Sequence, residues 1–132
     1  LFLDFIPEKI IIKDDLLKIL DNIKNKITYD ILIIKTSICN KRTEKTFWEN
    51  NYGFDPSVAE YLRVNFKNIR VIGFDSISVS SFSNRMLGRE AHREFLNPEK
   101  PILLLEDMDL NSLNVNIKYQ LFLKLWKQDF AR

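Results

Sequence analysis

An uninterrupted apolar run at residues 30–36 constrains the fold of this chain more than any other stretch. It reads DILIIKT, and no polar residue alternates with its isoleucines and leucine. A strand with one face in water usually alternates apolar and polar side chains, whereas a strand covered on both faces does not. We therefore expect residues 30–36 to form a central strand of a sheet that is covered on both faces.

Similar runs predict the neighbours of that strand. Residues 1–6, 70–75 and 102–105 are rich in Val, Ile, Leu and Phe, and a shorter β-branched run covers residues 9–12. We expect residues 102–105 to form a third buried strand, after residues 30–36 and 70–75. Residues 119–127 partly alternate apolar and polar side chains, which predicts a strand. Leucines and aromatic residues four positions apart leave a helix there as the alternative.

Helices are expected between these strands. Apolar residues recur at helical spacing over residues 14–25, 56–67 and 86–96. Asp55 can cap the second of these helices. Pro56 suits its first position, because no backbone N–H is required there. The second helix is therefore expected to cross over between two parallel strands.

Strands that alternate with helices indicate an α/β fold with a mixed or mostly parallel sheet. We expect one such domain over residues 1–132. Residues 37–54 are predicted to form a long polar loop that its own aromatic side chains can pack. Residues 76–83 are rich in serine, and their hydroxyls either line a site or satisfy backbone groups in a loop.

Composition argues against several classes of protein. The chain has 132 residues, 45% of them hydrophobic and 12% aromatic, which suffices for a folded core. Its 20 basic and 18 acidic residues give a net charge of +2 without a basic block, so we expect no nucleic-acid partner. No apolar run is long enough to span a membrane. Cys39 is the only cysteine and suits a reducing compartment, so we expect a cytoplasmic protein.

His92 and Glu106 are the candidate site residues. His92 is the only histidine and lies in the expected helix 86–96, while Glu106 closes the apolar run 102–105 and Asp75 closes another. Ligands of open α/β sheets bind at the C-terminal ends of strands. An imidazole and a carboxylate suit Zn²⁺ and related divalent ions. The pair is therefore either two ligands of one metal ion, or a structural histidine and a solvated carboxylate.

Spacing alone favours the structural interpretation. A catalytic zinc needs about three protein ligands, and one histidine without a cysteine cluster cannot supply them. Asp75 is either a turn-forming residue or a group that supports a metal ligand from behind. The sequence contains no GxSxG, GxGxxG, P-loop or CxxC motif, and Cys39 has the character of a buried thiol rather than a nucleophile.

Five segments in one order resemble the metal-dependent cyclase family of hydrolases, which includes bacterial kynurenine formamidases. They are ILIIKT (31–36), FDPSVAEYL (54–62), VIGFDS (71–76), AHREFL (91–96) and ILLLEDMDL (102–110). The resemblance covers nearly the whole chain, and its specificity comes from the order of the segments rather than from any single one.

The resemblance implies a swivelling β/β/α fold that binds one or two zinc or manganese ions and cleaves a linear amide, such as a formyl amide, with a metal-activated water. It assigns His92 and Glu106 as metal ligands, whereas Asp75 is a possible supporting group by its position alone. It also implies a small-molecule amide substrate and a homo-oligomer. The family's remaining ligands and its catalytic histidine lie in an H-x-G-T-H-x-D-x-P-x-H motif, which this sequence does not contain.

Two further features bear on that interpretation. The chain begins within a strand-like run without an initiator Met, so we expect it to be truncated at the N-terminus, and slightly at the C-terminus, with the catalytic residues upstream of Leu1. Thr36-Ser37 stands where family members often have Thr-Gly, and the spacing from His92 to Glu106 is slightly long. The alternative is a catalytically inactive relative that serves as a structural or oligomerisation domain.

Overall fold

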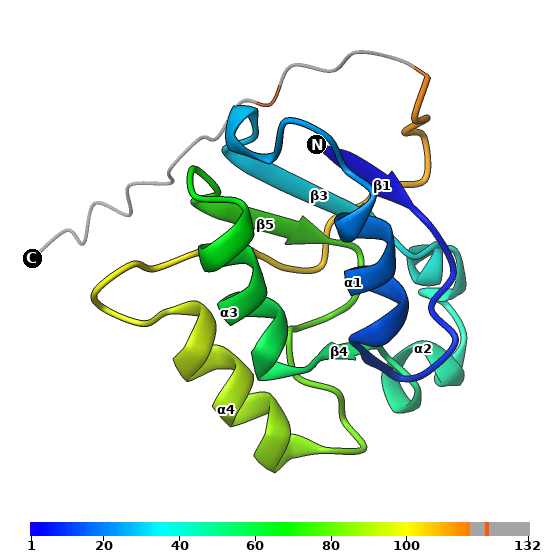
Figure 1. Ribbon diagram of the computed structural model, residues 1–132. Coiled ribbons are helices and arrows are strands. Elements are labelled where there is room, and N and C mark those ends of the chain that lie inside the picture. The colour runs from blue at the N-terminus through cyan, green and yellow to red at the C-terminus, as the bar shows by residue number, and fades with distance from the viewer. Residues whose placement is uncertain (117–120, 122–132) are drawn as a thin grey trace, which may run out of the picture.

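A four-stranded parallel sheet forms the centre of the computed structural model, which describes residues 1–116 and 121 (Figure 1). Its strands are β1 (Phe2–Asp4), β3 (Ile31–Lys35), β5 (Val71–Phe74) and β6 (Leu103–Leu105), in that order across the sheet. Every neighbouring pair is parallel. The α/β fold is therefore confirmed, and among the described residues this sheet is parallel rather than mixed.

Helices α1 (Asp14–Asp21), α3 (Pro56–Asn65) and α4 (Arg85–Phe95) connect these strands, and α3 and α4 lie side by side (Figure 1). The predicted cap of α3 is confirmed, because Asp55 Oδ1 accepts a hydrogen bond from Ser57 N at 3.0 Å. Helix α1 is shorter than expected. It ends at Asp21, and the chain turns through a left-handed Asn25 (φ 53°) into a 3₁₀ turn, η1 (Lys26–Thr28).

The expected loop at residues 37–54 contains regular structure that its polar sequence did not predict. It forms the 3₁₀ turn η2 (Ile38–Lys41), the short helix α2 (Lys45–Glu49) and the strand β4 (Gly53–Phe54). Strand β4 pairs in parallel with β2 (Ile11–Ile12) in a second, two-stranded sheet. Phe47 is fully buried and anchors α2, as the aromatic content of the segment predicted, but Trp48 is 58% exposed.

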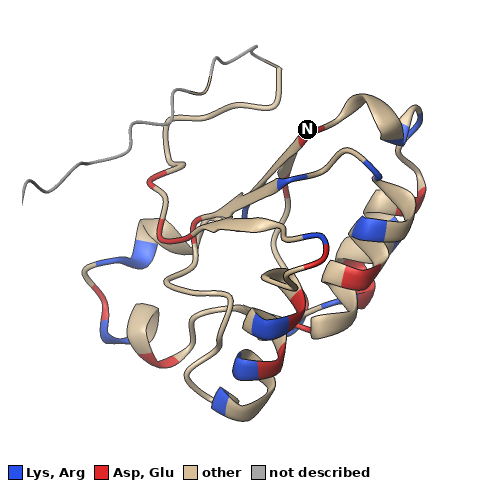
Figure 2. Cartoon of the chain, turned by 90° about the vertical axis from the view of Figure 1, so that its left-hand side faces the viewer, with Lys and Arg blue, Asp and Glu red and all other residues tan. Residues whose placement is uncertain are grey.

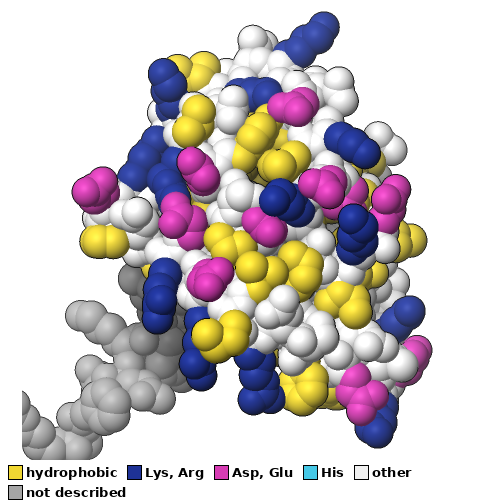
Figure 3. Space-filling model, turned by 60° about the horizontal axis from the view of Figure 1, so that its bottom comes forward, with side chains coloured by type: hydrophobic (Ala, Val, Ile, Leu, Met, Phe, Trp, Pro, Cys, Tyr) yellow, Lys and Arg dark blue, Asp and Glu magenta, His cyan; other side chains and the backbone are white. Residues whose placement is uncertain are grey.

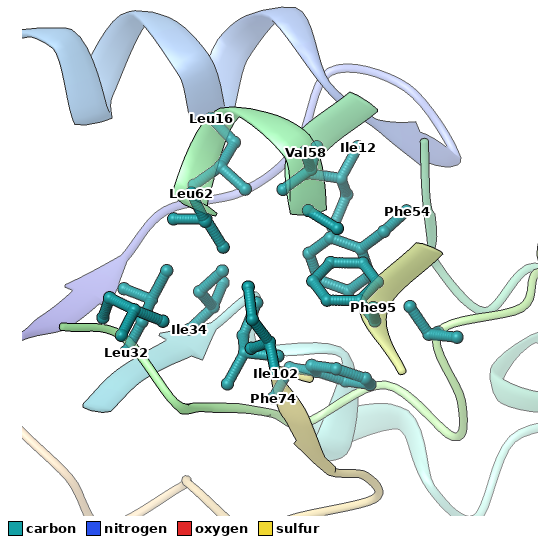
Figure 4. Packing of buried hydrophobic residues seen from close by; sticks show 14 of the residues in the cluster. Ile12, Leu16, Leu32, Ile34, Phe54, Val58, Leu62, Phe74, Phe95 and Ile102 are labelled. Carbon is teal, nitrogen blue, oxygen red and sulfur yellow. The ribbon is translucent and has the colours of Figure 1, made fainter. Parts of the chain in front are cut away.

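One hydrophobic core lies between the four-stranded sheet and the helices, and the labelled side chains of Figure 4 converge on it. Leu32 and Ile34 of β3 point into this core and are fully buried, whereas Ile31 and Ile33 on the other face are only half-buried. Among the described residues the second face is therefore only partly covered, whereas we expected both faces of this strand to be covered. The helices pack on one face, and Met108 approaches the other at Gly73.

Strand β6 also differs from expectation. Leu103 is 55% exposed and Leu104 and Leu105 are half-buried, so the prediction of a third buried strand is wrong for β6, although Ile102 just before it is fully buried. Among the described residues β6 lies at the edge of the sheet and pairs only with β5. An edge strand lacks a neighbour on one side, which leaves part of its surface uncovered.

Charged residues lie mainly on the helices and loops, as Figure 2 shows. The face seen in Figure 3 carries acidic and basic side chains interspersed with hydrophobic ones. Among the described residues, none of the helices combines the length and hydrophobicity that crossing a bilayer requires. The strand predicted at residues 119–127, with its helical alternative, falls outside the described residues apart from position 121.

Candidate functional site

His92 and Glu106 meet beside the C-terminal edge of the sheet. Helix α4 carries His92, and Glu106 follows directly after β6. His92 Nε2 lies 3.5 Å from Glu106 Oε1, and the two side chains are 37% and 31% exposed. Two residues that are 14 positions apart thus come together where solvent, and a ligand, can reach them.

The orientation of the His92 ring is set by its own helix. Nδ1 lies 3.0 Å from the carbonyl oxygen of Gly88, one turn earlier in α4. Because a carbonyl oxygen can only accept, Nδ1 carries the proton and donates it. Ser80 Oγ lies 3.3 Å from the same nitrogen. A neutral ring in this tautomer leaves the Nε2 lone pair free to bind a cation.

Glu106 is held just as firmly. Its Oε1 accepts hydrogen bonds from the backbone N–H of Val79 at 2.8 Å and from the Ser78 hydroxyl at 3.1 Å. Both donors belong to the serine-rich loop at residues 76–83. This loop therefore touches both members of the pair, through Ser80 on the His92 side and through Ser78 and Val79 on the Glu106 side.

The geometry of the pair suits two ligands of one ion. Zn–N and Zn–O bonds are about 2.1 Å long and tetrahedral, so two ligand atoms of one zinc lie about 3.4 Å apart. The measured separation of Nε2 and Oε1 is 3.5 Å. When His92 is neutral, two lone-pair acceptors face each other across this gap. A cation between them, or a proton on Nε2, removes that repulsion.

The pair does not make a complete metal site. Within the described part of the chain, no group of three His, Cys, Asp or Glu side chains is placed to hold a metal ion. The donor types fit zinc or manganese, and their hydrogen bonds to backbone groups are of the kind that orients metal ligands. The number of donors falls short of the three that a catalytic zinc needs.

Asp75 has a different set of contacts. It is fully buried at the end of β5, and its Oδ1 accepts hydrogen bonds from the Thr36 N–H at 2.9 Å and the Thr36 hydroxyl at 2.7 Å. Asp75 thus ties the end of β5 to the end of β3. Among the described residues its Oδ2 has no hydrogen-bond partner. No hydrogen bond within the described residues joins Asp75 to His92 or Glu106, so its supporting role remains a prediction.

Cys39 lies close to Asp75 rather than to the pair. It is 4% exposed, and its thiol donates a hydrogen bond to Asn111 Oδ1 at 3.1 Å. Burial and the neighbouring Asp75 raise the pKa of the thiol, although a backbone contact at Leu110 partly opposes them. The thiol is therefore held in its neutral form, as expected of a buried cysteine.

Two glycines clamp the serine-rich loop. A Cβ atom on Gly88 would overlap the Ser80 side chain and lie 2.8 Å from Ser80 Cα, and one on Gly53 would lie 2.9 Å from Ser81 Cβ. The backbones of α4 and β4 therefore approach the loop where no side chain intervenes. From the sequence alone, the hydroxyls of this loop could either line a site or satisfy backbone groups. The signal was five serines between a buried strand and a helix that carries the only histidine.

A separate hollow lies away from the His92–Glu106 pair. It encloses about 680 Å³ between residues 6–10 and the segment from Thr36 to Tyr52.

Comparisons with family models, curated proteins and solved structures find no match to this chain. The resemblance to the cyclase family therefore remains a prediction from the five segments, and the site must be judged by its own geometry.

Proposed function

We propose that this protein is a metal-dependent hydrolase of the cyclase and arylformamidase type, which cleaves a linear formyl amide. The observation that carries the proposal is the approach of His92 Nε2 to Glu106 Oε1 at 3.5 Å, with Nδ1 directed at Gly88 O so that the Nε2 lone pair of a neutral ring would face Glu106. The family resemblance assigns these same two residues as ligands, without any knowledge of that distance.

In this proposal the two residues hold zinc or manganese. When bound, such an ion lowers the pKa of its water to about 7 and polarises the amide carbonyl. His92 supplies a neutral nitrogen whose direction is set by Gly88. Glu106 supplies a negative charge whose position is set by Val79 N–H and the Ser78 hydroxyl. His92 does not have to reorganise before a cation binds, whereas Glu106 Oε1 would have to share or give up one of the two hydrogen bonds that it accepts.

The remaining ligands and the catalytic group come, in this proposal, from sequence that precedes Leu1 in a longer chain. The support is the shortage of donors among the described residues. The resemblance places the missing histidines and aspartate in one upstream motif. A gene in which that motif precedes Leu1 would strengthen the proposal, and a start codon close to Leu1 would contradict it.

The direct test uses the longest natural chain that contains these residues. His92→Ala should lower the zinc or manganese content measured by elemental analysis and abolish formyl-amide hydrolysis, with the circular dichroism spectrum unchanged. Arg93→Ala, which changes the next residue of the same helix, is the matched control and should keep both. Unchanged metal content in His92→Ala would refute the assignment.

A structural role for Glu106 has its own supporting observation, because Oε1 already accepts two hydrogen bonds from the serine-rich loop. The alternative function is therefore a catalytically inactive relative in which the pair holds the loop against β6. Glu106→Gln distinguishes a metal ligand from a structural residue. The amide oxygen can still accept both hydrogen bonds from the loop, but the side chain carries no charge. We expect weaker metal binding at unchanged stability. Metal affinity equal to that of the wild type would leave Glu106 a structural residue only.

A further inference from the structure

The hollow between residues 6–10 and the segment from Thr36 to Tyr52, here named the β1–β3 hollow, lies beyond the carboxyl ends of two neighbouring strands. Residues 6–10 follow β1, and Thr36 follows β3, which pairs with β1 in parallel (Figure 1). Ligands of open α/β sheets bind in crevices at this end of the strands. Its volume of about 680 Å³ is in the range of small-molecule sites, and neither His92 nor Glu106 lines it.

Hydrogen bonds to neighbouring elements hold both walls of the β1–β3 hollow. On the β3 side, the N–H and the hydroxyl of Thr36 donate to Oδ1 of the fully buried Asp75, at 2.9 and 2.7 Å. On the β1 side, the N–H of Glu8 donates to Asp15 Oδ2 at 3.0 Å, which ties residues 6–10 to helix α1. The hollow is therefore formed before a ligand arrives, as small-molecule sites usually are.

The charged side chains that line the β1–β3 hollow cancel one another. They are two glutamates and two lysines, Glu8, Glu44, Lys9 and Lys41, so the formal charge of the lining is zero. Clefts that select an anion or a cation are lined by an excess of the opposite charge. The balance in this hollow favours a neutral ligand.

The lining also offers polar groups that both donate and accept hydrogen bonds. Ser37, Asn40, Asn50 and Tyr52 all line the hollow, and none of these four side chains has a hydrogen-bond partner among the residues that the structure describes. Amide and hydroxyl groups combine donor and acceptor atoms, and so does a hydroxyl group on a ligand. Ser37 has a φ of 63°, a strained conformation of the kind that collects at ligand sites.

We infer that the β1–β3 hollow binds a neutral polyhydroxylated molecule, a mono- or disaccharide, whose hydroxyls bond to Ser37, Asn40 and Asn50. A sugar combines a rim of hydroxyls with C–H faces that pack on apolar surface. Tyr52 has an apolar ring as well as its hydroxyl, and Ile6 at the edge of the hollow is 74% exposed. This ligand is additional to the proposed amide substrate, and its binding does not depend on the proposed function.

Binding can be measured directly and located at the same time. The probes are D-glucose and maltose, with glucose 6-phosphate and cyclohexanol as controls, titrated into the ¹⁵N-labelled folded chain. We expect a sugar dissociation constant of about millimolar size, which suits so small a ligand. The amide signals that move should be those of residues 6–10 and of the segment from Thr36 to Tyr52. Cyclohexanol should bind at least about tenfold more weakly, because it carries a single hydroxyl.

Three outcomes of this titration would overturn the inference. The first is that neither D-glucose nor maltose binds, and the second is that the shifted signals lie outside the two named segments. The third is that glucose 6-phosphate binds about tenfold more tightly than D-glucose and that Lys41→Gln removes this advantage. The hollow would then be an anion site rather than one for a neutral ligand.

Matched variants make the result specific. Asn40→Ala and Asn50→Ala should each weaken sugar binding about fivefold, the size expected for one lost hydrogen bond. Both positions are exposed, so neither substitution should unfold the chain. Thr43→Ala, at an exposed position of the same segment outside the hollow, should leave binding unchanged. Sugar binding as tight in the Asn40→Ala, Asn50→Ala double variant as in the wild type would refute the assignment.

His92→Ala distinguishes this inference from the proposed function. It should keep sugar binding, because His92 does not line the hollow, whereas the proposed function requires that it lose metal. Sugar binding in a protein that binds no metal would uphold the hollow and refute the hydrolase. Metal binding that depends on His92 but comes without sugar binding would refute the hollow alone.

Discussion

Gly88 and Ser80 touch without an intervening side chain, and this contact determines where the serine-rich loop meets helix α4. A Cβ atom on Gly88 would lie 2.8 Å from Ser80 Cα and would overlap the Ser80 side chain. Ser80 in turn lies 3.3 Å from His92 Nδ1, whose ring also donates to the Gly88 carbonyl. One glycine thus positions both the loop and the imidazole of the candidate site.

Gly88→Ala should therefore destabilise the protein, although it lies within a helix. Alanine raises helix propensity by about 1 kcal/mol over glycine. Overpacking against a backbone typically costs about 1–3 kcal/mol, and this term should prevail here because Ser80 Cα cannot rotate away. Urea denaturation measures the difference. Glu90→Ala, at an exposed position of the same helix, is the control and should change the free energy of unfolding by less than about 0.5 kcal/mol. A Gly88→Ala protein more stable than the wild type would show that the serine-rich loop moves away from α4 at little cost in free energy.

Ser37 is held in a conformation that favours glycine. Its φ is 63°, at the start of η2 and directly after Thr36, which binds Asp75. The left-handed region costs a residue with a Cβ atom about 1 kcal/mol or more. Ser37→Gly should therefore raise the free energy of unfolding by up to about 1 kcal/mol, as read from the midpoint of denaturation. Ser37→Ala keeps the Cβ atom and should show no such gain. Equal effects of the two substitutions would refute the explanation by strain.

Local signals in the sequence predicted the parts of this fold that depend on neighbouring residues. Strand β3 followed from its own apolar run, and the start of α3 followed from Asp55 and Pro56, because capping is decided within one turn. The position of Glu106 directly after a strand followed from the apolar run 102–105, whereas its approach to His92 was only one of two interpretations that the sequence left open. These predictions needed no knowledge of contacts between distant segments.

The parts that the sequence did not predict depend on such distant contacts. Leu103 is exposed because it lies on the face of the sheet away from the helices, in register with Val71 and Ile31, and because β6 is an edge strand among the described residues. Strand order depends on pairing between segments far apart. Helix α2 has one buried anchor, Phe47, and so shows no repeating pattern. The roles of Ser78 and Ser80 depend on how the loop folds back, to which serine composition contributes only a general preference for turns.

The cap at Asp55 predicts a specific loss of stability in acid. Burial acts to raise the pKa of Asp55, but hydrogen bonds from Ser57 and the charge of Lys13 outweigh it, so the pKa lies below its ordinary value. A depressed folded-state pKa contributes stability that is present above the unfolded pKa and is lost as the pH falls through the folded one. Asp55→Ala should cost about 1 kcal/mol at neutral pH.

Asp55→Asn isolates the charge from the cap. Asparagine caps helices about as well as aspartate, so most of the stability at neutral pH should remain. Its amide does not titrate, so the part of the acid loss that comes from Asp55 should disappear. Denaturation midpoints between pH 2 and 7 measure both effects. An unchanged acid profile in Asp55→Asn would mean that other carboxylates account for the whole loss.

Cys39 predicts the opposite dependence, in alkali. Burial and Asp75 raise the pKa of the folded thiol above its ordinary value of 9.0. The unfolded chain therefore loses this proton at a lower pH than the folded protein does. The stability contributed by the neutral thiol is complete below the unfolded pKa and is lost as the pH rises toward the folded one. Between pH 8 and 11 the free energy of unfolding should thus fall less steeply in Cys39→Ala than in the wild type.

The native thiol should also react slowly with Ellman's reagent near pH 8 and rapidly in denaturant, because the thiolate is the reactive form. Fast reaction of the folded protein would show that Cys39 is accessible and ionised, and the buried contacts with Asp75 and Asn111 could not then persist in solution.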